Sequence, residues 1–394
     1  MPPVILNEKL RSDLVHSQKI PVHMDDYISF EDSSAYRFEA IMRKLGNDQG
    51  VNNTKVEFME MGVYPNKMVC SAIEAAGETS IEVDYPAYAH RDNLILNTRT
   101  GEIYLMAEDL GGTTNAGFIK VTAHKGSGGI EAATAVNDVL LILPEAHAEG
   151  EAVPDGYSMK PEFLSTYIMQ SDMSCGPYTD IAEAQGEYGE KQILINRKLK
   201  WIEWKQKKAL AFYFGAEQRE TTSAGGPRRH TMRGLRNWYT TNRIDYGAVT
   251  GGVSLSSIGE LMRNVTMIGA SSESKLCMAG QNAMVTASAL PATAIRTDIN
   301  TEKWGWAIKT IVTTFGTLGL LYEPVFSSEN GLADVMCVID TKHTKMLHLN
   351  GLRDRMYLDV GSKRDIHNME DVISGTFGLR VNHEKTGAWG YGIV

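Results

Sequence analysis

A long helical stretch near the middle of the chain constrains the fold more than any other feature. The spacing of apolar residues predicts a helix over about 179–214, with its regular part from Glu190 to Phe214. At a rise of 1.5 Å per residue, that part forms a rod on the order of 37 Å long. One apolar stripe runs along it, made of Ile195, Leu199, Ile202, Ala209 and Tyr213. Such a helix needs a second layer to cover its stripe, and we expect Gly215 to end it in a left-handed conformation.

Basic residues gather beside this stripe. Lys191, Lys198 and Lys205 are a heptad apart and therefore share one side of the predicted helix. The basic surface continues around the back with Arg197, Lys200, Lys207 and Lys208. Two interpretations stay open at this point. The surface is either a solvated helix face or a set of contacts to nucleic-acid phosphates that reads no sequence.

Before the helix, residues 55 to about 150 alternate with the two-residue period of β-strands. The alternating segments are Lys55–Met61, Ser80–Asp84, Asn93–Asn97, Gly101–Glu108, Gly117–His124 and Asp138–Leu143. A Thr-Arg-Thr-Gly turn between the third and fourth segments predicts a hairpin. Because no helical period interrupts them, we expect an inserted antiparallel β-unit of about 90 residues.

The remaining parts mix helices and strands. Residues 1–54 show a short helical pattern at 36–45 and otherwise no sustained period. Ordering a backbone costs roughly 1–2 kcal/mol per residue, so we expect this arm to lie on another surface. Between 234 and 361, a helix predicted at 254–269 and capped by Ser254 alternates with strands. The expected fold class is therefore α+β.

The formal net charge of −9 is unevenly distributed along the chain. Through Asp180 there are 13 Lys and Arg against 27 Asp and Glu, and the remainder holds 26 against 21. The first part is therefore near −14 and the second near +5. This split indicates two surfaces with different partners and excludes a uniformly basic nucleic-acid binder.

The sequence contains no catalytic or cofactor-binding motif. The sequence lacks the motifs of the nucleophile elbow, the phosphate-binding loop and the zinc-protease helix. Its four cysteines form no Cys-x-x-Cys pair. His343 and His348 are five residues apart, which suits no single helix face. We therefore expect no enzyme, no cofactor and no metal. Without a leader pattern or a long apolar run, we also expect no membrane partner.

Several local strings occur in an order that resembles one protein family. Tyr178-Thr-Asp-Ile opens the predicted helix, and Glu203-Trp-Lys-Gln-Lys-Lys-Ala-Leu-Ala-Phe-Tyr-Phe-Gly closes it. Met232-Arg-Gly-Leu-Arg-Asn-Trp-Tyr-Thr-Thr-Asn follows. Later strings are Thr314-Phe-Gly, Gly331-Leu-Ala-Asp-Val and Thr376-Phe-Gly-Leu-Arg-Val-Asn-His-Glu. Taken with the arm, the β-unit and the returning strands, this order resembles the major capsid proteins of tailed bacteriophages, which have the Hong-Kong-97 (HK97-like) fold.

The resemblance implies a self-assembling shell protein whose hexamers and pentamers enclose double-stranded DNA. It divides the chain into an N-terminal arm at 1–54, an extended loop with the inserted β-unit at 55–150, a peripheral domain at 151–233 with the spine helix at about 179–214, an axial domain at 234–361, and C-terminal strands at 362–394 that return to the peripheral domain. The arm and the extended loop would reach over neighbouring copies.

In that family the spine helix faces the packaged genome. The resemblance therefore implies non-specific phosphate contacts by Lys191, Arg197, Lys198, Lys205 and Lys208. It also implies a place in the virion capsid, assembly in the host cytoplasm, and portal, scaffolding and decoration proteins as further partners. Two alternatives stay open: the shell of an encapsulin-like nanocompartment, and an uncharacterised soluble enzyme with an acidic β-domain.

Overall fold

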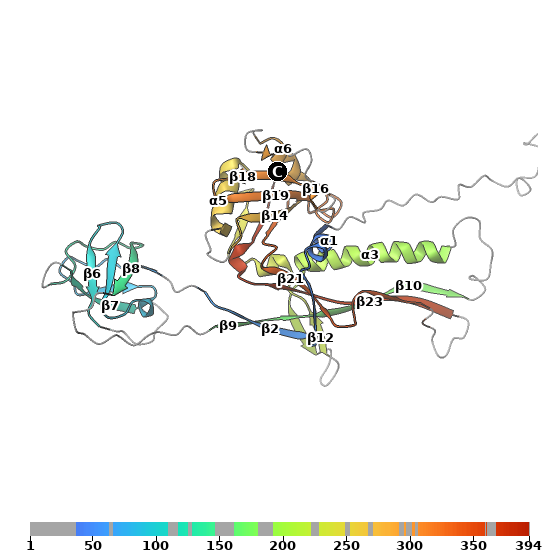
Figure 1. The fold of residues 1–394 in the computed structure, drawn as a ribbon, viewed down its shortest axis with the longest axis horizontal. Helices are drawn as coiled ribbons and strands as arrows, with labels where there is room; N and C mark the ends of the chain where they lie inside the picture. Colours follow the sequence, from blue (N-terminus) through green and yellow to red (C-terminus); the bar gives the residue numbers. More distant parts are fainter. Residues whose placement is uncertain are drawn as a thin grey trace, which may run out of the picture. The chain divides into compact units, whose positions relative to one another are not determined.

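The chain divides into two compact units (Figure 1). The computed structural model describes residues 37–62, 66–108, 117–124, 128–145, 161–179, 192–221, 228–248, 253–266, 271–290, 295–296, 302–303, 306–358, 360 and 368–393. The core unit holds the residues up to Phe58 and those from Phe163 onward, and the inserted unit holds 59–162. The chain leaves the core unit and returns to it through a two-stranded ribbon of β2 (Lys55–Glu60) and β9 (Glu162–Tyr167).

Six strands of the inserted unit form a sheet that closes on itself. They are β3 (Lys67–Val69), β4 (Ser80–Val83), β5 (Asn93–Asn97), β6 (Ile103–Met106), β7 (Gly117–Ala123) and β8 (Val139–Glu145). All neighbours are antiparallel, in the order β3-β8-β5-β6-β7-β4. A bridge between Cys70 and Val83 then joins the two outer strands, and the Ser71 N–H donates to the Glu82 carbonyl at 2.9 Å. Along this stretch of described residues, both outer strands are therefore paired.

The alternation in the sequence explains the core of the inserted unit, because every second side chain of a strand points inward. The inward residues are Met68, Ile81, Val83, Ile95, Tyr104, Met106, Ile119, Val121 and Leu140. Strands form in all the segments where the sequence predicts them. The predicted β-unit ends at 150, whereas the compact unit runs to Glu162. Residues 146–160 lie outside the described part of the chain.

In the core unit, a five-stranded sheet joins the beginning, middle and end of the chain. Its strands are β1 (Asp48–Val51), β10 (Met169–Thr179), β21 (Thr344–Leu349), β22 (Arg355–Tyr357) and β23 (Asn368–Val381). The order is β1-β21-β23-β10, with β22 also paired to β23. Antiparallel pairing of β10 with β23 closes the core unit behind the insertion, because β10 follows the inserted unit directly.

A seven-stranded sheet forms the second layer of the core unit. Its order is β13 (Arg243–Asp245), β24 (Ala388–Tyr391), β20 (Met336–Ile339), β14 (Ser274–Ala279), β19 (Gly316–Tyr322), β18 (Lys309–Thr313) and β15 (Ile295–Arg296). Helices α5 (Leu255–Thr266) and α6 (Gln281–Ser288) pack against it (Figure 1). Ser254 caps α5 as predicted, since its Oγ accepts from the Ser257 N–H at 3.2 Å.

The core unit also contains several shorter helices and strands. They are the helices α1 (Arg37–Lys44) and α4 (Leu235–Trp238), the 3-10 turn Glu384–Thr386, and the strand pairs β11 (Gln218–Thr221) with β12 (Arg228–Thr231) and β16 (Glu302–Lys303) with β17 (Trp306–Ala307). In the inserted unit, a 3-10 turn spans Pro86–Tyr88. The helix predicted at 36–45 is thus present as α1.

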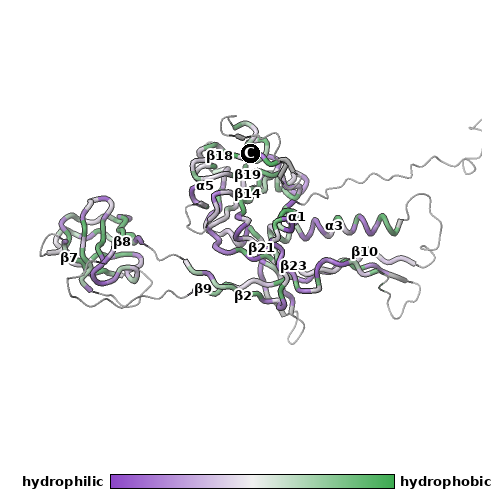
Figure 2. Tube along the Cα trace, in the orientation of Figure 1, coloured by the Kyte–Doolittle hydropathy of each residue, from purple (hydrophilic) through white to green (hydrophobic). Residues whose placement is uncertain are grey.

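The long helix α3 (Gln192–Phe214) lies along β10 and β23, and its buried side is wider than the predicted stripe. Within the stripe, Ile195, Ala209 and Tyr213 are buried, but Leu199 is 45% exposed. Outside the stripe, Trp204, Lys208 and Phe212 are buried as well. The second half of α3 is covered twice, by Phe377 of β23 and by Phe38 of α1. Hydrophilic and hydrophobic residues alternate along it in Figure 2. A single stripe cannot describe a helix that is covered from two directions.

The helix ends at Phe214 as predicted, but not by the expected left-handed glycine. Gly215 has no positive φ. Instead, a Cβ there would lie 2.7 Å from the carbonyl oxygens of Ala211 and Met232, and the Gly234 N–H donates to the Gly215 carbonyl at 2.8 Å. Glycine is required because a second backbone segment crosses the helix end.

The closed sheet and its separate core predict that residues 59–162 fold alone. We expect the excised unit to unfold cooperatively in denaturant, because its apolar side chains are buried within the unit itself. Circular dichroism during a urea titration measures this.

A shortened version without β8 is the matched control. Removing β8 leaves β3 and β5 without their shared neighbour, so this version should show no cooperative transition. If the complete unit also unfolds without a transition, the inserted unit depends on the rest of the chain.

Candidate functional site

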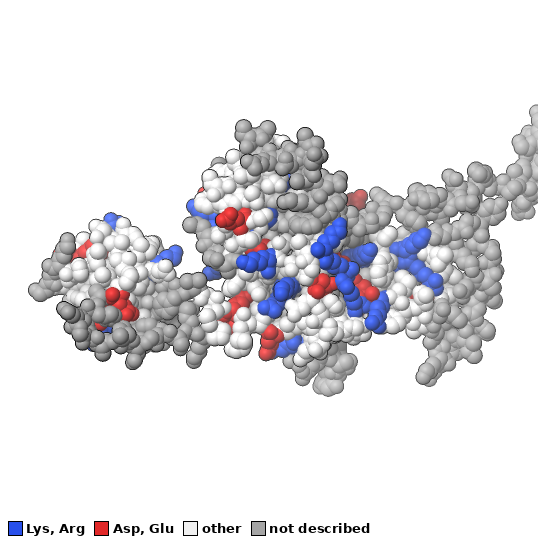
Figure 3. Space-filling view, in the orientation of Figure 1, with Lys and Arg blue, Asp and Glu red and all other residues white. Residues whose placement is uncertain are grey.

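The five basic residues expected to contact phosphate do not form one surface. Lys191 lies outside the described residues, Lys198 is exposed and Lys205 is half-buried. Arg197 and Lys208 form ion pairs inside the core unit. On the face drawn in Figure 3, acidic side chains lie among the basic ones of the core unit.

Lys208 is buried between carboxylates, with only 5% of its side chain exposed. Its Nζ lies 2.9 Å from Glu39 Oε1 and 2.6 Å from Asp354 Oδ2. It also lies 5.4 Å from the ring centre of Phe377. Two carboxylates of the same chain already neutralise the charge of Lys208, so this geometry does not favour the predicted contact with DNA. The heptad pattern could not reveal this second covered side of α3.

Arg197 also points inward. Its Nε lies 2.5 Å from Asp371 Oδ2 and its Nη2 lies 3.2 Å from Oδ1, while Asp371 is 1% exposed. The hydrogen bond to Asp371 raises the pKa of the Arg197 guanidinium. The expected role in contacting phosphate does not fit this geometry, because the bidentate pair fastens the first half of α3 to β23.

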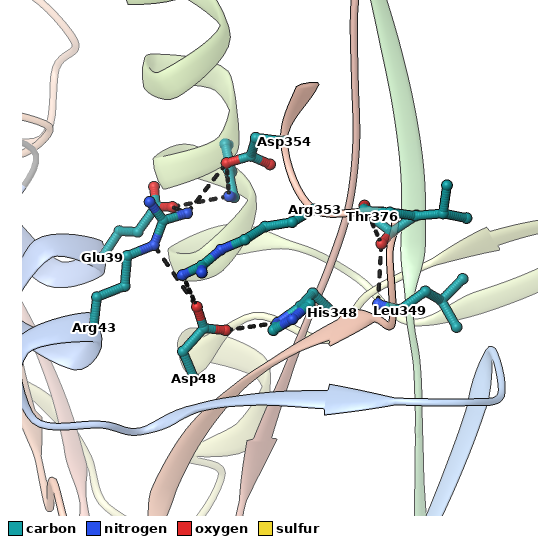
Figure 4. A network of polar contacts seen from close by, with 10 residues as sticks. Glu39, Arg43, Asp48, His348, Leu349, Arg353, Asp354 and Thr376 are labelled. Carbon is teal, nitrogen blue, oxygen red and sulfur yellow. Dashed lines mark hydrogen bonds and ion pairs between the residues drawn. The ribbon is translucent and has the colours of Figure 1, made fainter. Parts of the chain in front are cut away.

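The partners of Lys208, Glu39 and Asp354, belong to a charged network that joins α1 to α3 and to the five-stranded sheet (Figure 4). Arg43 pairs with Glu39, and its Nη2 lies 3.3 Å from Asp354 Oδ2. Beyond α1, Asp48 Oδ1 lies 2.8 Å from His348 Nδ1, and Asp48 also pairs with Arg353. The network therefore joins segments about 300 residues apart in sequence, as in the 305 positions between Asp48 and Arg353.

A second polar contact holds the start of α1. The fully buried carboxylate of Glu323 accepts from the Phe38 N–H at 3.0 Å and from the Tyr213 hydroxyl at 3.1 Å, both through Oε2. The Arg37 N–H donates to Oε1 at 3.4 Å. Burial raises the pKa of Glu323 to about 7, although these hydrogen bonds favour the charged form.

A groove of about 240 Å³ opens between α3 and β10. Its lining includes Met169, Met173, Trp204, Lys207, Ala211 and Phe377. The indole Nε1–H of Trp204 is buried and has no hydrogen-bond partner in the part of the chain that the structure describes. The groove is therefore mixed, because Ser171, Asp172 and Lys208 also line it, beside one unused donor and the Lys207 ammonium group.

The β2–β9 ribbon is anchored at its base and exposed beyond it. Phe58 packs against Trp238 at 6.1 Å between ring centres, and the Arg380 Cζ lies 4.6 Å from the centre of the Phe58 ring. The large apolar side chains that follow are exposed: Met59 at 61%, Met61 at 56% and Phe163 at 69%.

Sequence reasoning missed the residues that do most to organise these surfaces. Nothing in the sequence around Glu39 or Asp354 marks these residues as partners of Lys208. Glu323 carried a usable signal, because it is the acidic residue that directly ends the apolar run Leu318–Tyr322. A lone carboxylate in that position needs a specific partner.

The structure bears on a metal site and on a membrane-spanning helix for the described residues alone. Among them, no group of three or more His, Cys, Asp or Glu side chains is arranged to hold a metal ion. No described helix is both long enough and apolar enough to cross a membrane.

The burial of Lys208 predicts a large loss of stability when its charge is removed. Lys208→Ala leaves Glu39 and Asp354 with the more exposed Arg43 as their remaining shared cation, so we expect a loss of about 3 kcal/mol in the free energy of unfolding, the lower end for a broken buried ion pair. Lys207→Ala is the neighbouring control, since its side chain is 63% exposed. It should cost at most about 0.5 kcal/mol. Denaturant titration measures both, and similar costs for the two variants would contradict the assigned role of Lys208.

Comparison with known proteins identifies the family. A model of the SU10 major capsid protein family matches residues 33–393. No curated protein matches the chain.

Solved structures with a similar arrangement include three shells. The capsid of a native GTA particle is 8% identical, with 97% of this chain and 98% of that chain covered and a TM-score of 0.46. For the capsid of Myoviridae phage XM1, the identity is 10%, the coverage 97% and 100%, and the TM-score 0.43. The SrpI encapsulin complex from Synechococcus elongatus is 12% identical, with coverage of 60% and 78% and a TM-score of 0.39.

All three TM-scores lie below 0.5, so the assignment rests on the family match. That match decides for the phage capsid protein over the encapsulin-like and enzymatic alternatives. Because it leaves out only the first 32 residues and the last one, the chain belongs to the SU10 major capsid protein family and is a structural protein of the virion that forms the icosahedral shell of a tailed phage.

Proposed function

We propose that this capsid protein assembles into hexamers and pentamers through its β2–β9 ribbon, and that the resulting shell encloses double-stranded DNA. The observation that carries the proposal is the exposure of Met59 and Phe163 on a ribbon of only two strands, and of Met61 directly after β2. A two-stranded ribbon is marginally stable by itself in water. These side chains therefore gain most from a surface on a second copy.

The groove beside Trp204 offers such a surface. Its methionines and Phe377 suit an apolar side chain, and the Trp204 indole N–H can donate to a backbone carbonyl of the incoming ribbon. We therefore place the ribbon of one copy in the groove of its neighbour.

A double cysteine variant tests this contact. The four native cysteines are buried, so Phe163→Cys combined with Met173→Cys introduces the accessible pair. We expect oxidised particles to contain disulfide-linked chains that separate on reduction, because a disulfide needs the two Cα atoms within about 7 Å. Electrophoresis without reductant measures the links, and electron microscopy of the same particles shows whether hexamers and pentamers form.

Phe118→Cys combined with Met173→Cys is the matched control, because Phe118 is also exposed, at 53%, but lies in the inserted unit. Intact shells in which the Phe163 pair forms no more links than the Phe118 pair would overturn the proposed docking.

The remaining parts follow the family arrangement. In this proposal the arm at 1–54 reaches across neighbouring copies, the axial domain at 234–361 meets its copies at the centre of each capsomer, and the strands from 362 return to the peripheral domain at 151–233. The inserted unit within the extended loop stands out as a surface for further partners, such as decoration proteins.

Contact with the packaged DNA is assigned to a smaller basic set than the sequence implied. Lys198 and Lys205 lie a heptad apart on α3 and are exposed and half-buried, respectively. Contacts of this kind are electrostatic, so they weaken with salt and do not depend on DNA sequence. Lys208 and Arg197 are not part of this set because of their ion pairs.

Charge reversal at both positions, Lys198→Glu with Lys205→Glu, should lower the ratio of DNA-filled to empty shells severalfold, because like charges then face the phosphates. Sedimentation in a density gradient separates the two kinds of particle. Lys342→Glu reverses an exposed charge outside α3 and should leave the ratio unchanged. A normal ratio in the double variant would remove DNA binding from this face.

A further inference from the structure

The junction of α1, α3 and β19 contains a buried carboxyl group that the capsid function does not explain. Glu323 is fully buried, and its neighbours in the core are the aromatic rings of Phe38, Tyr213 and Phe326. None of the described Lys or Arg side chains forms an ion pair with it. We propose that Glu323 is a proton-operated latch: its neutral carboxylic acid holds α1 against α3, and loss of the proton loosens α1.

The hydrogen bonds of Glu323 connect it directly to both α1 and α3. Oε2 receives the two shorter bonds, from the Phe38 N–H at 3.0 Å and the Tyr213 hydroxyl at 3.1 Å. Oε1 receives a longer contact, from the Arg37 N–H at 3.4 Å, and the Val325 N–H is a further donor to this carboxyl group. A proton on Oε1 therefore keeps both short bonds, because Oε2 then acts as the carbonyl oxygen of the acid.

Opposing effects act on the ionised form. The first N–H groups of a helix favour a negative charge near its start. Complete burial removes water from the carboxylate, however, and without a paired cation this cost is the larger of the two. The net result is that the pKa of Glu323 rises to about 7. The pKa of Glu323 therefore lies within the range of cellular pH.

The groups around the latch do not change charge in the same range. On α3, burial keeps the Tyr213 hydroxyl protonated by raising its pKa well above the usual value. The Cys277 and Cys337 thiols, from β14 and β20, have pKa values raised by burial. On α1, the Arg37 guanidinium lies over the Tyr322 ring at 5.7 Å.

The sign of the effect follows from the raised pKa. A carboxyl group with a pKa of about 7 when docked and an ordinary value of 4.5 when released favours docking most below pH 4.5. That advantage is lost as the pH rises toward 7. Between pH 6 and pH 8, the docking equilibrium of α1 should weaken about tenfold.

Hydrogen exchange on the unassembled full-length chain tests the latch. After correction for the intrinsic effect of pH, protection of the amides in 37–44 should fall about tenfold between pH 6 and pH 8. In Glu323→Gln, a neutral side chain of the same shape, protection should be independent of pH and higher than in the native chain at pH 8. Amides of β6 in the inserted unit serve as the internal reference.

Glu384→Gln is the matched control. Glu384 also accepts backbone N–H groups, from Thr240 and Thr241. Partial burial acts to raise its pKa, but the hydrogen bonds from Thr241 and Thr240 prevail and lower it. This variant should keep the native pH response of α1. An unchanged pH response in Glu323→Gln, or protection of α1 that does not vary with pH in the native chain, would overturn the latch. Neither result depends on assembly, so failure of the proposed ribbon contact would be seen separately.

Discussion

The antiparallel pairing of β10 with β23 is the interaction on which the rest of the structure depends. It joins the first strand after the insertion to a strand near the end of the chain, so the core unit cannot close until nearly all of the chain is present. α3 lies on this pair, and the Arg197–Asp371 contact fixes its first half there. The groove beside Trp204 exists because α3 is held at the edge of β10. The surface that we propose for assembly is thus a by-product of closing the core unit.

Both polar and apolar contacts position α1 in the core unit. α1 buries Phe38, Ile41 and Met42, yet its orientation depends on Glu323 at one end and on the Glu39–Lys208–Asp354 contacts along its side. Buried polar contacts of this kind add little net stability but strongly disfavour alternative arrangements, because any shift leaves a charge unpaired. α1 is therefore fixed in register against α3 and remains sensitive to changes of charge.

Sequence periodicity predicted the elements whose burial is one-sided. The strands of the inserted unit, α1 and α5 all bury one face, so alternation or helical spacing revealed them. The second half of α3 is covered from two directions, and there the pattern misplaced Lys208 on the surface. The glycines of β23 weakened its pattern for a related reason. A Cβ at Gly375 would lie 2.5 Å from Asp354 Oδ1 and 3.1 Å from Trp204 Cζ2. Glycine at this position therefore lets both residues pack close to the strand.

The candidate surfaces were less predictable than the fold, because each is assembled from distant segments. The groove combines residues of β10, α3 and β23, and the latch combines α1, α3 and the end of β19. No spacing within one segment encodes such combinations. The family resemblance gave the order of the parts, but it could not show which lysines of α3 are already paired within the chain.

Closure of the inserted sheet affects how neighbouring copies of the chain can interact in the shell. Many identical copies of this unit are held at very high local concentration, where any open strand edge would recruit the same edge of another copy and extend without limit. Because the outer strands of this sheet pair with each other, they are not open to pairing with another copy. The inserted unit can therefore vary its loops and its acidic surface freely, because strand exchange between neighbours has no template from which to begin.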